Sequence, residues 1–172
     1  IVGLPDNAVK ESLQRIESTF KTNGYQMPRT KVVVNLAPAD IKKSGTPFDL
    51  PIALGVLGAS EQIENRDALA NYVIMGELSL NGEIRAIKGA LPIAIQARKE
   101  GFKGLIVPKV NAKEAGMVNN LSVYGVTHIN EVIDFFEFIP LVGFFDCLTT
   151  SPTAPSAAHR TRPGPLPPRT SR

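Results

Sequence analysis

The first pattern in the chain is a stripe of four apolar residues spaced by 4, 3 and 4 positions: Val9, Leu13, Ile16 and Phe20. This spacing places the stripe on one face of a helix. Asp6 suits the N-cap of that helix, and Asn23-Gly24 suits its end. We therefore expect a first helix between these two signals.

A second helix is expected after residue 45. Thr46-Pro47-Phe48-Asp49 places a hydroxyl three residues before a carboxylate, which is the pattern of a capping box, with proline at the first helical position. The residues from there to about Ala59 are almost all apolar. A helix with hardly any polar face should be buried on several sides.

Runs of β-branched or alternating residues predict strands. Residues 31–36 (KVVVNL) form one such run, and a loop follows between Pro38 and Gly45. Residues 72–80 predict a strand that leads into Asn81-Gly82, the commonest two-residue hairpin turn. Residues 83–87 would then return antiparallel to it.

The second half of the chain continues to alternate helices and strands. A helix is expected over residues 89–100, with one side formed by Leu91, Ala94, Ile95 and Arg98. The other expected elements are a strand over 104–107, a short helix over 111–115, a strand over 122–126 and a helix over 129–138. This order predicts an α/β or α+β fold, with a mixed sheet because a hairpin interrupts the alternation.

Length and composition favour one globular domain in a reducing compartment. The chain has 172 residues, and its only cysteine, Cys147, excludes an internal disulfide. No apolar run approaches the roughly 20 residues that span a bilayer, and no leader peptide opens the sequence. We expect a soluble, cytoplasmic protein without membrane contact, and the abrupt start at Ile1 suggests a fragment.

The charge is unevenly distributed between the body and the C-terminal end. Residues 139–172 hold four arginines against Asp146, which accounts for the whole net charge of +3. Residues 1–138 hold 15 basic and 15 acidic residues. A neutral body argues against a strong phosphate-binding surface, because nucleic-acid affinity without base reading comes mainly from neutralised phosphates.

Residues 139–172 are also rich in proline and arginine, and we expect disorder from about Ser151. The run PGPLPPR contains a P-x-x-P spacing and offers a polyproline II ligand as the alternative to a plain extension. Removal of the residues after Ser151 should leave the melting temperature unaltered.

Sequence motifs for catalysis are sparse. No G-x-x-x-x-G-K-[ST] occurs, so the chain alone should not hydrolyse a nucleotide, and no G-x-G-x-x-G follows a strand. The two histidines, His128 and His159, lack acidic or thiol neighbours at metal-ligand spacing. We expect no cofactor and no metal in this chain, with His128 at a surface position before the last helix.

A serine and a lysine can together act as nucleophile and base without histidine. The candidates near turns are Ser44, Ser79, Lys42, Lys43 and Lys88. Ser79 is expected to face solvent, and Lys42-Lys43 to lie in a solvated loop. Lys88 precedes a helix, where a cation is unfavourable, which makes anion contact its most plausible role. Cys147 lacks a positioned base and is no credible nucleophile.

Four blocks, in order, carry a family resemblance: IVGLPDNAVKES, VNLAPADIKKSGTPFDLPIALGVL, GELSLNGEIRAIKGALPIAIQARKEGFKGLIVPK and VYGVTHINEVIDFF. Residues 1–138 resemble the amino-terminal domain of magnesium chelatase-related, ComM-like (YifB-type) AAA+ ATPases. The resemblance implies the fold of ribosomal protein S5 domain 2, shared with the Lon proteolytic domain, with the first strand or strands missing. It also implies a downstream ATPase domain that binds ATP and Mg²⁺.

The resemblance to Lon can be tested at its two catalytic positions. Lon-type proteases carry their serine in a P-S-A-G context, where this chain has Thr46-Pro47-Phe48-Asp49. Their lysine position falls near Leu91. We therefore predict no catalytic, cofactor-binding or metal-binding residue in this chain.

The function implied by the resemblance is a non-catalytic accessory domain of a hexameric motor that moves branched DNA during natural transformation. Its partners would be its own ATPase domain and, through the parent hexamer, DNA. A diverged Lon-like peptidase using Thr46 or Lys88, and a nucleic-acid-binding S5-like module, are the alternatives. Porphyrin metallation is less supported, because nothing in these residues offers a porphyrin or Mg²⁺ site.

Overall fold

The computed structural model describes residues 1–38 and 40–138. The predictions for residues 139–172, for Cys147 and for His159 concern positions outside this part of the chain. None of the helices in the described part is both long and apolar enough to cross a bilayer.

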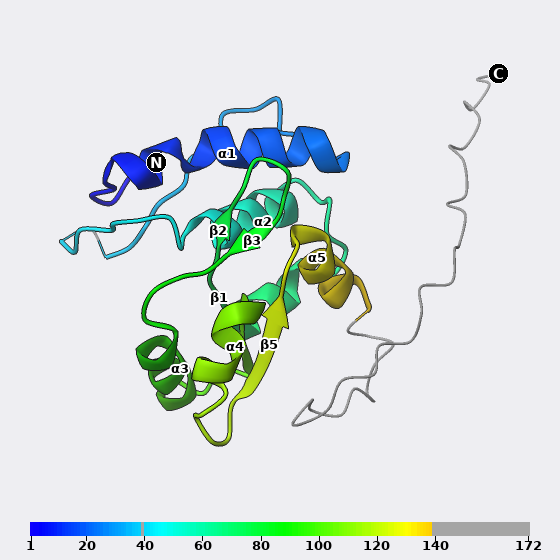
Figure 1. Ribbon diagram of the computed structural model, residues 1–172. Coiled ribbons are helices and arrows are strands. Elements are labelled where there is room, and N and C mark those ends of the chain that lie inside the picture. Colours follow the sequence, from blue (N-terminus) through cyan, green and yellow to red (C-terminus); the bar gives the residue numbers. More distant parts are fainter. Residues whose placement is uncertain (39, 139–172) are drawn as a thin grey trace.

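A three-stranded parallel sheet forms the centre of the domain (Figure 1). Its strands are β1 (Tyr72–Ile74), β4 (Gly104–Pro108) and β5 (Ser122–Val126), in the order β1-β4-β5. The central strand, β4, is buried along its whole length. Its apolar sequence, GLIVP, is typical of a parallel strand covered on both faces.

The side chains of β4 alternate between two hydrophobic clusters on opposite faces of the sheet. Leu105 and Val107 belong to one cluster, which α3 (Ala90–Lys99) and α4 (Lys109–Ala115) cover. Ile106 belongs to the other and larger cluster. The domain therefore has helices on both faces of the sheet, as an α/β fold requires.

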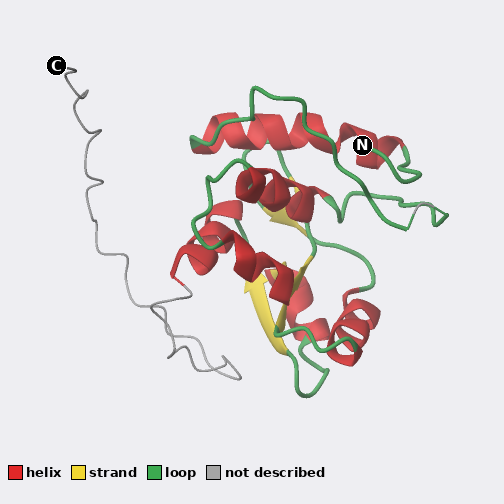
Figure 2. Ribbon diagram, turned by 180° about the vertical axis from the view of Figure 1, so that it is seen from behind, coloured by secondary structure: helices red, strands yellow, loops and turns green. Residues whose placement is uncertain are grey.

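The larger cluster joins α1 (Asn7–Asn23), α2 (Asp49–Ala59) and α5 (Ile129–Phe138). These helices lie on the same side of the sheet, with α1 outermost (Figure 2). Phe20 of α1, Leu54 of α2 and Phe136 of α5 are almost completely buried. The prediction that α2 is buried on several sides is confirmed.

The predicted strand over residues 72–80 is two separate strands. After β1 the chain turns at Gly76 and forms β2 (Glu77–Leu78), which pairs antiparallel with β3 (Ile84–Arg85). Gly76 donates to the Pro47 carbonyl at 3.0 Å and accepts from Leu50 N at 3.0 Å. These bonds to the start of α2 pull the chain away from the parallel sheet, so the two strand orientations occupy two sheets rather than one mixed sheet.

The hairpin turn lies at the predicted Asn81-Gly82, but it is longer by one residue. Ser79 N bonds the Glu83 carbonyl at 3.0 Å, so Leu80, Asn81 and Gly82 form a three-residue loop. Gly82 has φ of 97°, which the last residue of such a loop requires and glycine provides without strain.

The strand predicted over residues 31–36 is wrong. The segment is extended, but its only bridge within the described residues joins Asn35 to Val2. Val2 N donates to the Val34 carbonyl at 2.8 Å, and Leu36 N donates to the Val2 carbonyl at 2.9 Å. A β-branched run does not form a regular strand here, because its backbone pairs only with the short stretch around Val2.

Two of the helix predictions also need correction. For α1 the caps are as predicted, since Asp6 accepts from Val9 N at 2.9 Å and Gly24 is left-handed. For α2, the capping-box prediction is wrong, because no side chain caps it. For α3, the buried face consists of Ala90, Ala94 and Ala97, while Ile95 is 41% exposed. Small side chains allow α3 to approach its neighbours closely.

The other predicted elements are confirmed, with α4 beginning two residues earlier than expected. A short 3₁₀ helix, η1 (Arg66–Asn71), leads into β1 and has no counterpart in the predictions.

Candidate functional site

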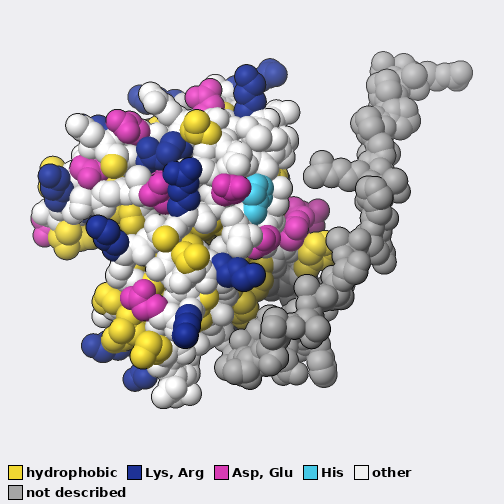
Figure 3. Space-filling model, in the orientation of Figure 1, with side chains coloured by type: hydrophobic (Ala, Val, Ile, Leu, Met, Phe, Trp, Pro, Cys, Tyr) yellow, Lys and Arg dark blue, Asp and Glu magenta, His cyan; other side chains and the backbone are white. Residues whose placement is uncertain are grey.

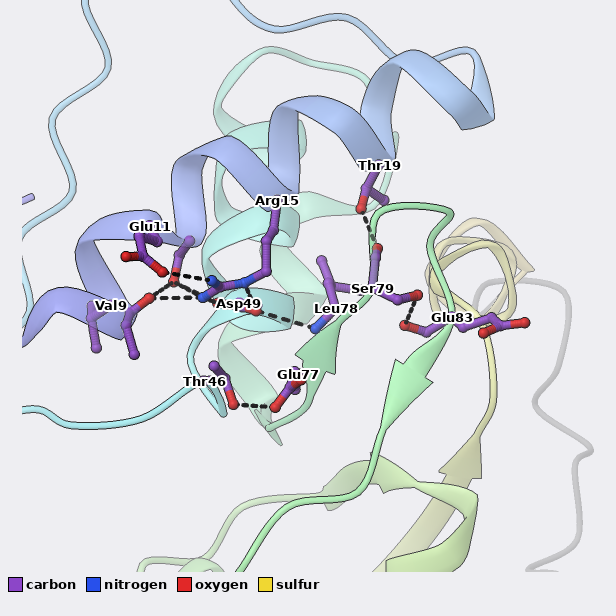
Figure 4. A network of polar contacts seen from close by, with 12 residues as sticks. Val9, Glu11, Arg15, Thr19, Thr46, Asp49, Glu77, Leu78, Ser79 and Glu83 are labelled. Carbon is purple, nitrogen blue, oxygen red and sulfur yellow. Dashed lines mark hydrogen bonds and ion pairs between the residues drawn. The ribbon is translucent and has the colours of Figure 1, made fainter.

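A network of polar contacts lies at the start of α2, where the resemblance to Lon places the nucleophile (Figure 4). Its centre is the carboxylate of Asp49, which is fully buried. Arg15 of α1 holds it in a bidentate pair, with Nε to Oδ2 at 2.7 Å and Nη2 to Oδ1 at 2.9 Å. Such a planar fork is the strongest geometry for an arginine and a carboxylate.

Two further groups donate hydrogen bonds to the Asp49 carboxylate. Ser12 Oγ donates to Oδ1, and Leu78 N of β2 donates to Oδ2 at 3.3 Å. The Asp49 carboxylate therefore joins α1, α2 and the hairpin. Its hydrogen bond to Arg15 also raises the pKa of that guanidinium, which keeps Arg15 charged.

The chemical capacity of this network is small. Asp49 has no exposed surface, and both of its oxygens already accept two hydrogen bonds. A general base must reach the proton that it removes, and this carboxylate cannot reach a substrate. The arrangement is that of a structural ion pair.

Thr46, the nucleophile of the alternative peptidase, lies three residues before Asp49. It donates to the carboxylate of Glu77 instead of capping α2. Lys88, the proposed partner in the alternative peptidase, is exposed and lies between β3 and α3. Within the described residues, Lys88 has no hydrogen bond or ion pair with Thr46.

The resemblance to Lon places the serine position at Pro47 or Phe48 and the lysine position near Leu91. The side chain of Phe48 packs against the larger cluster. The carbonyl of Pro47 accepts from Gly76 N, next to the larger cluster. The side chain of Leu91 packs against the smaller cluster, and its backbone N–H donates to Glu114 at 3.1 Å. These residues therefore support packing around α2 and α3.

The remaining sequence candidates are scattered over the domain. Ser44 and Lys42 lie in the loop before α2, and Lys42 is exposed, as expected. Lys43 is buried, contrary to the solvated loop predicted for it, and its ammonium group donates to the Pro38 carbonyl. That contact satisfies the cation within the loop.

The hairpin tip holds Ser79 and His128 in one polar group. Ser79 is only partly exposed, because its hydroxyl bonds Asn81 and the Glu83 carbonyl. His128 lies immediately before α5, as predicted; its Nδ1 accepts from Asn130 N at 3.2 Å, and its Nε2 faces the Asn81 carbonyl at 3.2 Å. These contacts fasten the hairpin to α5.

Within residues 1–38 and 40–138, no three His, Cys, Asp or Glu side chains are grouped so that they could hold a metal ion. An apolar groove of about 360 Å³ lies between residues 32–36 and the outer face of α2. Phe48, Pro51 and Gly55 line the helical side. A groove of this composition offers a contact surface and no reacting group.

Sequence reasoning missed the Asp49 network and the buried Asn111, whose amide bonds both the N–H and the carbonyl of Ile87. The sequence of α1 contains one indication of the Asp49 network. Ser12 and Thr19 lie three residues after Val9 and Ile16, which places two hydroxyls on the buried stripe of α1. Polar residues on a buried face require partners.

Comparison with known proteins was consistent with this architecture. Residues 1–111 match the family described as the ChlI subunit of Mg-chelatase. An uncharacterized protein of Escherichia coli K12, YifB, is 42% identical over 137 residues, which cover 80% of this chain and 27% of YifB. The competence protein ComM of Haemophilus influenzae is 38% identical over 144 residues, covering 82% of this chain and 28% of ComM.

A more distant relative is the archaeal Lon protease of Thermococcus kodakarensis, 27% identical over 139 residues that cover 78% of this chain and 21% of the protease. The chain thus spans about a quarter of the length of the relatives that it matches.

Proposed function

We propose a role for this chain, which belongs to the family described as the ChlI subunit of Mg-chelatase. It is a non-catalytic accessory and interaction domain of a ComM-like AAA+ ATPase. The parent protein would bind ATP and Mg²⁺ through a separate ATPase domain and would remodel DNA. This domain would supply a rigid body that contacts partners.

One observation carries the proposal. The polar side chains at the position of a Lon-type nucleophile are engaged with one another, through Asp49 with Arg15 and through Thr46 with Glu77. A hydroxyl nucleophile needs a base that accepts its proton, and in the Ser-Lys arrangement this base is the neutral amine of a lysine in contact with the hydroxyl. The resemblance to Lon places Pro47 or Phe48 at the serine position and Leu91 near the lysine position.

Proteolysis assays test the proposal against the peptidase alternative. The 172-residue chain, incubated with fluorescein-labelled casein, should release no more fluorescence than buffer, while an active Lon protease in parallel confirms the substrate. Cleavage above that background that disappears in Thr46→Ala or Lys88→Ala would overturn the non-catalytic role. Cleavage that persists in both variants would indicate a contaminating protease, which a second purification step removes.

A further inference from the structure

The net charge of residues 1–138 is zero, but positive and negative side chains lie in different parts of the domain. Residues 85–121, which surround the smaller cluster, are called the basic lobe here. The basic lobe carries seven Lys and Arg against two Glu, a net charge of +5. The rest of the described chain carries eight basic and 13 acidic residues, a net charge of −5.

All seven cations of the basic lobe are exposed: Arg85, Lys88, Arg98, Lys99, Lys103, Lys109 and Lys113. Arg85 ends β3, Lys88 precedes α3, and Arg98 and Lys99 lie in the last turn of α3. Lys103 lies in the turn before β4, and Lys109 and Lys113 lie in α4, which packs against α3. Figure 3 shows separate Lys and Arg side chains among hydrophobic ones in the lower part of the molecule, where Figure 1 places α3 and α4, and others in the upper part.

These cations are not neutralised inside the domain. In the described part of the chain, Arg15 pairs with Glu11 and Asp49, Arg66 pairs with Glu61, and no ion pair involves a cation of the basic lobe. The two carboxylates of the lobe have other partners. Glu100 accepts from the Gln96 amide at 2.6 Å, and Glu114 accepts from Leu91 N at 3.1 Å.

We infer that the basic lobe binds the phosphate backbone of duplex DNA without reading its sequence. This inference specifies a partner for the interaction role proposed above and rests on it. With 10 residues, α3 is about 15 Å long, and over that length a duplex presents about nine phosphate charges. Cations spread around two packed helices fit such a repeated array better than they fit a single anion.

The composition of the lobe favours a duplex over a single strand. Single-stranded nucleic acids are held by aromatic side chains on which bases stack. Phe102 is the only aromatic residue between positions 85 and 121, and it is half-buried. Five of the seven cations are lysines, which contact phosphate as point charges and carry no base specificity.

The test compares two variants of the full chain that lose the same charge. In the lobe variant four lysines become glutamine: Lys99, Lys103, Lys109 and Lys113. In the control variant four exposed lysines outside the lobe become glutamine: Lys10, Lys21, Lys31 and Lys42. A third variant replaces the four arginines after residue 159 by glutamine, which separates their contribution from that of the lobe.

Binding to a fluorescein-labelled 30-base-pair duplex is measured by anisotropy between 50 and 200 mM salt. We expect the lobe variant to bind at least about tenfold more weakly at 50 mM salt. The slope of log K against log [salt] should fall by about 3.6 when all four lysines contact phosphate, since each lost contact contributes about 0.9. The control should change affinity less than about threefold.

Three results would overturn the inference: no binding by the unmodified chain at 50 mM salt, equal losses in the lobe and control variants, or a loss confined to the arginine variant. Circular dichroism verifies folding, and the pair Lys109→Gln/Lys113→Gln replaces the lobe variant if that variant does not fold. The pair should produce about half of the change in slope.

A protein partner is the competing explanation, because Val110 and Met117 in the lobe are 74% and 72% exposed. Sedimentation measures self-association of the same variants. Self-association that only the lobe variant loses, without DNA binding by the unmodified chain, would assign the lobe to a contact with the acidic part of a second copy. A negative DNA result leaves the casein assay unaffected, so failures of the two proposals are distinguishable.

Discussion

The carboxylate of Asp49 connects α1, α2 and the hairpin, so its removal should affect the whole larger cluster. A Thr-x-x-Asp cap would cost about 1 kcal/mol on substitution. The observed buried ion pair predicts about 3 kcal/mol for Asp49→Ala, because Arg15 is left without its counter-charge at a site where its side chain is only 19% exposed. The urea midpoint measures the difference.

The exposed partner of Arg15 provides the control for this prediction. Glu11 lies 3.8 Å from the guanidinium with 64% of its side chain exposed, so Glu11→Gln should cost less than about 0.5 kcal/mol. The pair Arg15→Met/Asp49→Leu should cost less than Asp49→Ala, since it leaves no isolated charge. Equal losses for Asp49→Ala and Glu11→Gln would contradict a structural role of the ion pair.

A second carboxylate, Asp6, should make stability depend on pH. Hydrogen bonds from Val9 N, first, and from Gly45 N lower the pKa of Asp6. A pKa lower in the folded state than in the unfolded chain stabilises the fold above the ordinary carboxylate value of about 4, and this contribution is lost as the pH falls through the folded value. The urea midpoints of the wild type and Asp6→Ala should therefore converge between pH 5 and pH 2. A constant difference would mean that the charge is irrelevant to the cap.

At the level of elements, Gly76 separates β1 from the hairpin and has no space for a side chain. A Cβ there would lie 2.9 Å from Ile84 Cγ2 and 3.1 Å from Leu50 Cδ2. Gly76→Ala should destabilise the domain by about 1 to 3 kcal/mol through overpacking. Gly55 in α2 is the control, because a Cβ there meets nothing within 4 Å. Gly55→Ala should stabilise by up to about 1 kcal/mol. Thermal unfolding that shifts in the same direction for both would contradict this reasoning.

The elements that the sequence predicts well are those whose signals are local. The caps of α1, the buried run of β4 and the stripe of α5 are each contained within a few neighbouring residues. The failures involve distant partners. The strand expected over residues 31–36 lacks a long pairing partner in the described chain, and Asp49 was interpreted as a cap because Arg15, 34 residues earlier, cannot be inferred from a local pattern.

The basic lobe and the Lon-type positions also differ in how much of each the sequence predicts. Each cation of the basic lobe can be read from the sequence, yet the net charge of residues 1–138 is zero. What the fold adds is that α3 and α4 pack against each other and that all seven cations are exposed, which places them on one part of the surface. The Lon-type positions, in contrast, could be compared within the sequence, because Pro47 or Phe48 and Leu91 fall within continuous blocks of resemblance.

For the molecule as a whole, the two clusters should unfold together, because β4 contributes alternate side chains to each. Leu105 is fully buried against α3 and α4, so Leu105→Ala should destabilise by about 2 to 5 kcal/mol. All three tyrosines pack against the opposite cluster, and the chain has no tryptophan. Tyrosine fluorescence therefore reports the side of the sheet that this substitution does not touch.

Coincident urea transitions by tyrosine fluorescence and far-ultraviolet circular dichroism, both shifted by Leu105→Ala, are the expected result for one cooperative unit. A tyrosine transition that stays at its wild-type midpoint while the dichroism moves would show that α3 and α4 open separately. The basic lobe would then be a detachable element of the fold. Because Ile106 lies between Leu105 and Val107 on the same buried strand, we expect loss of either cluster to remove the support of the other.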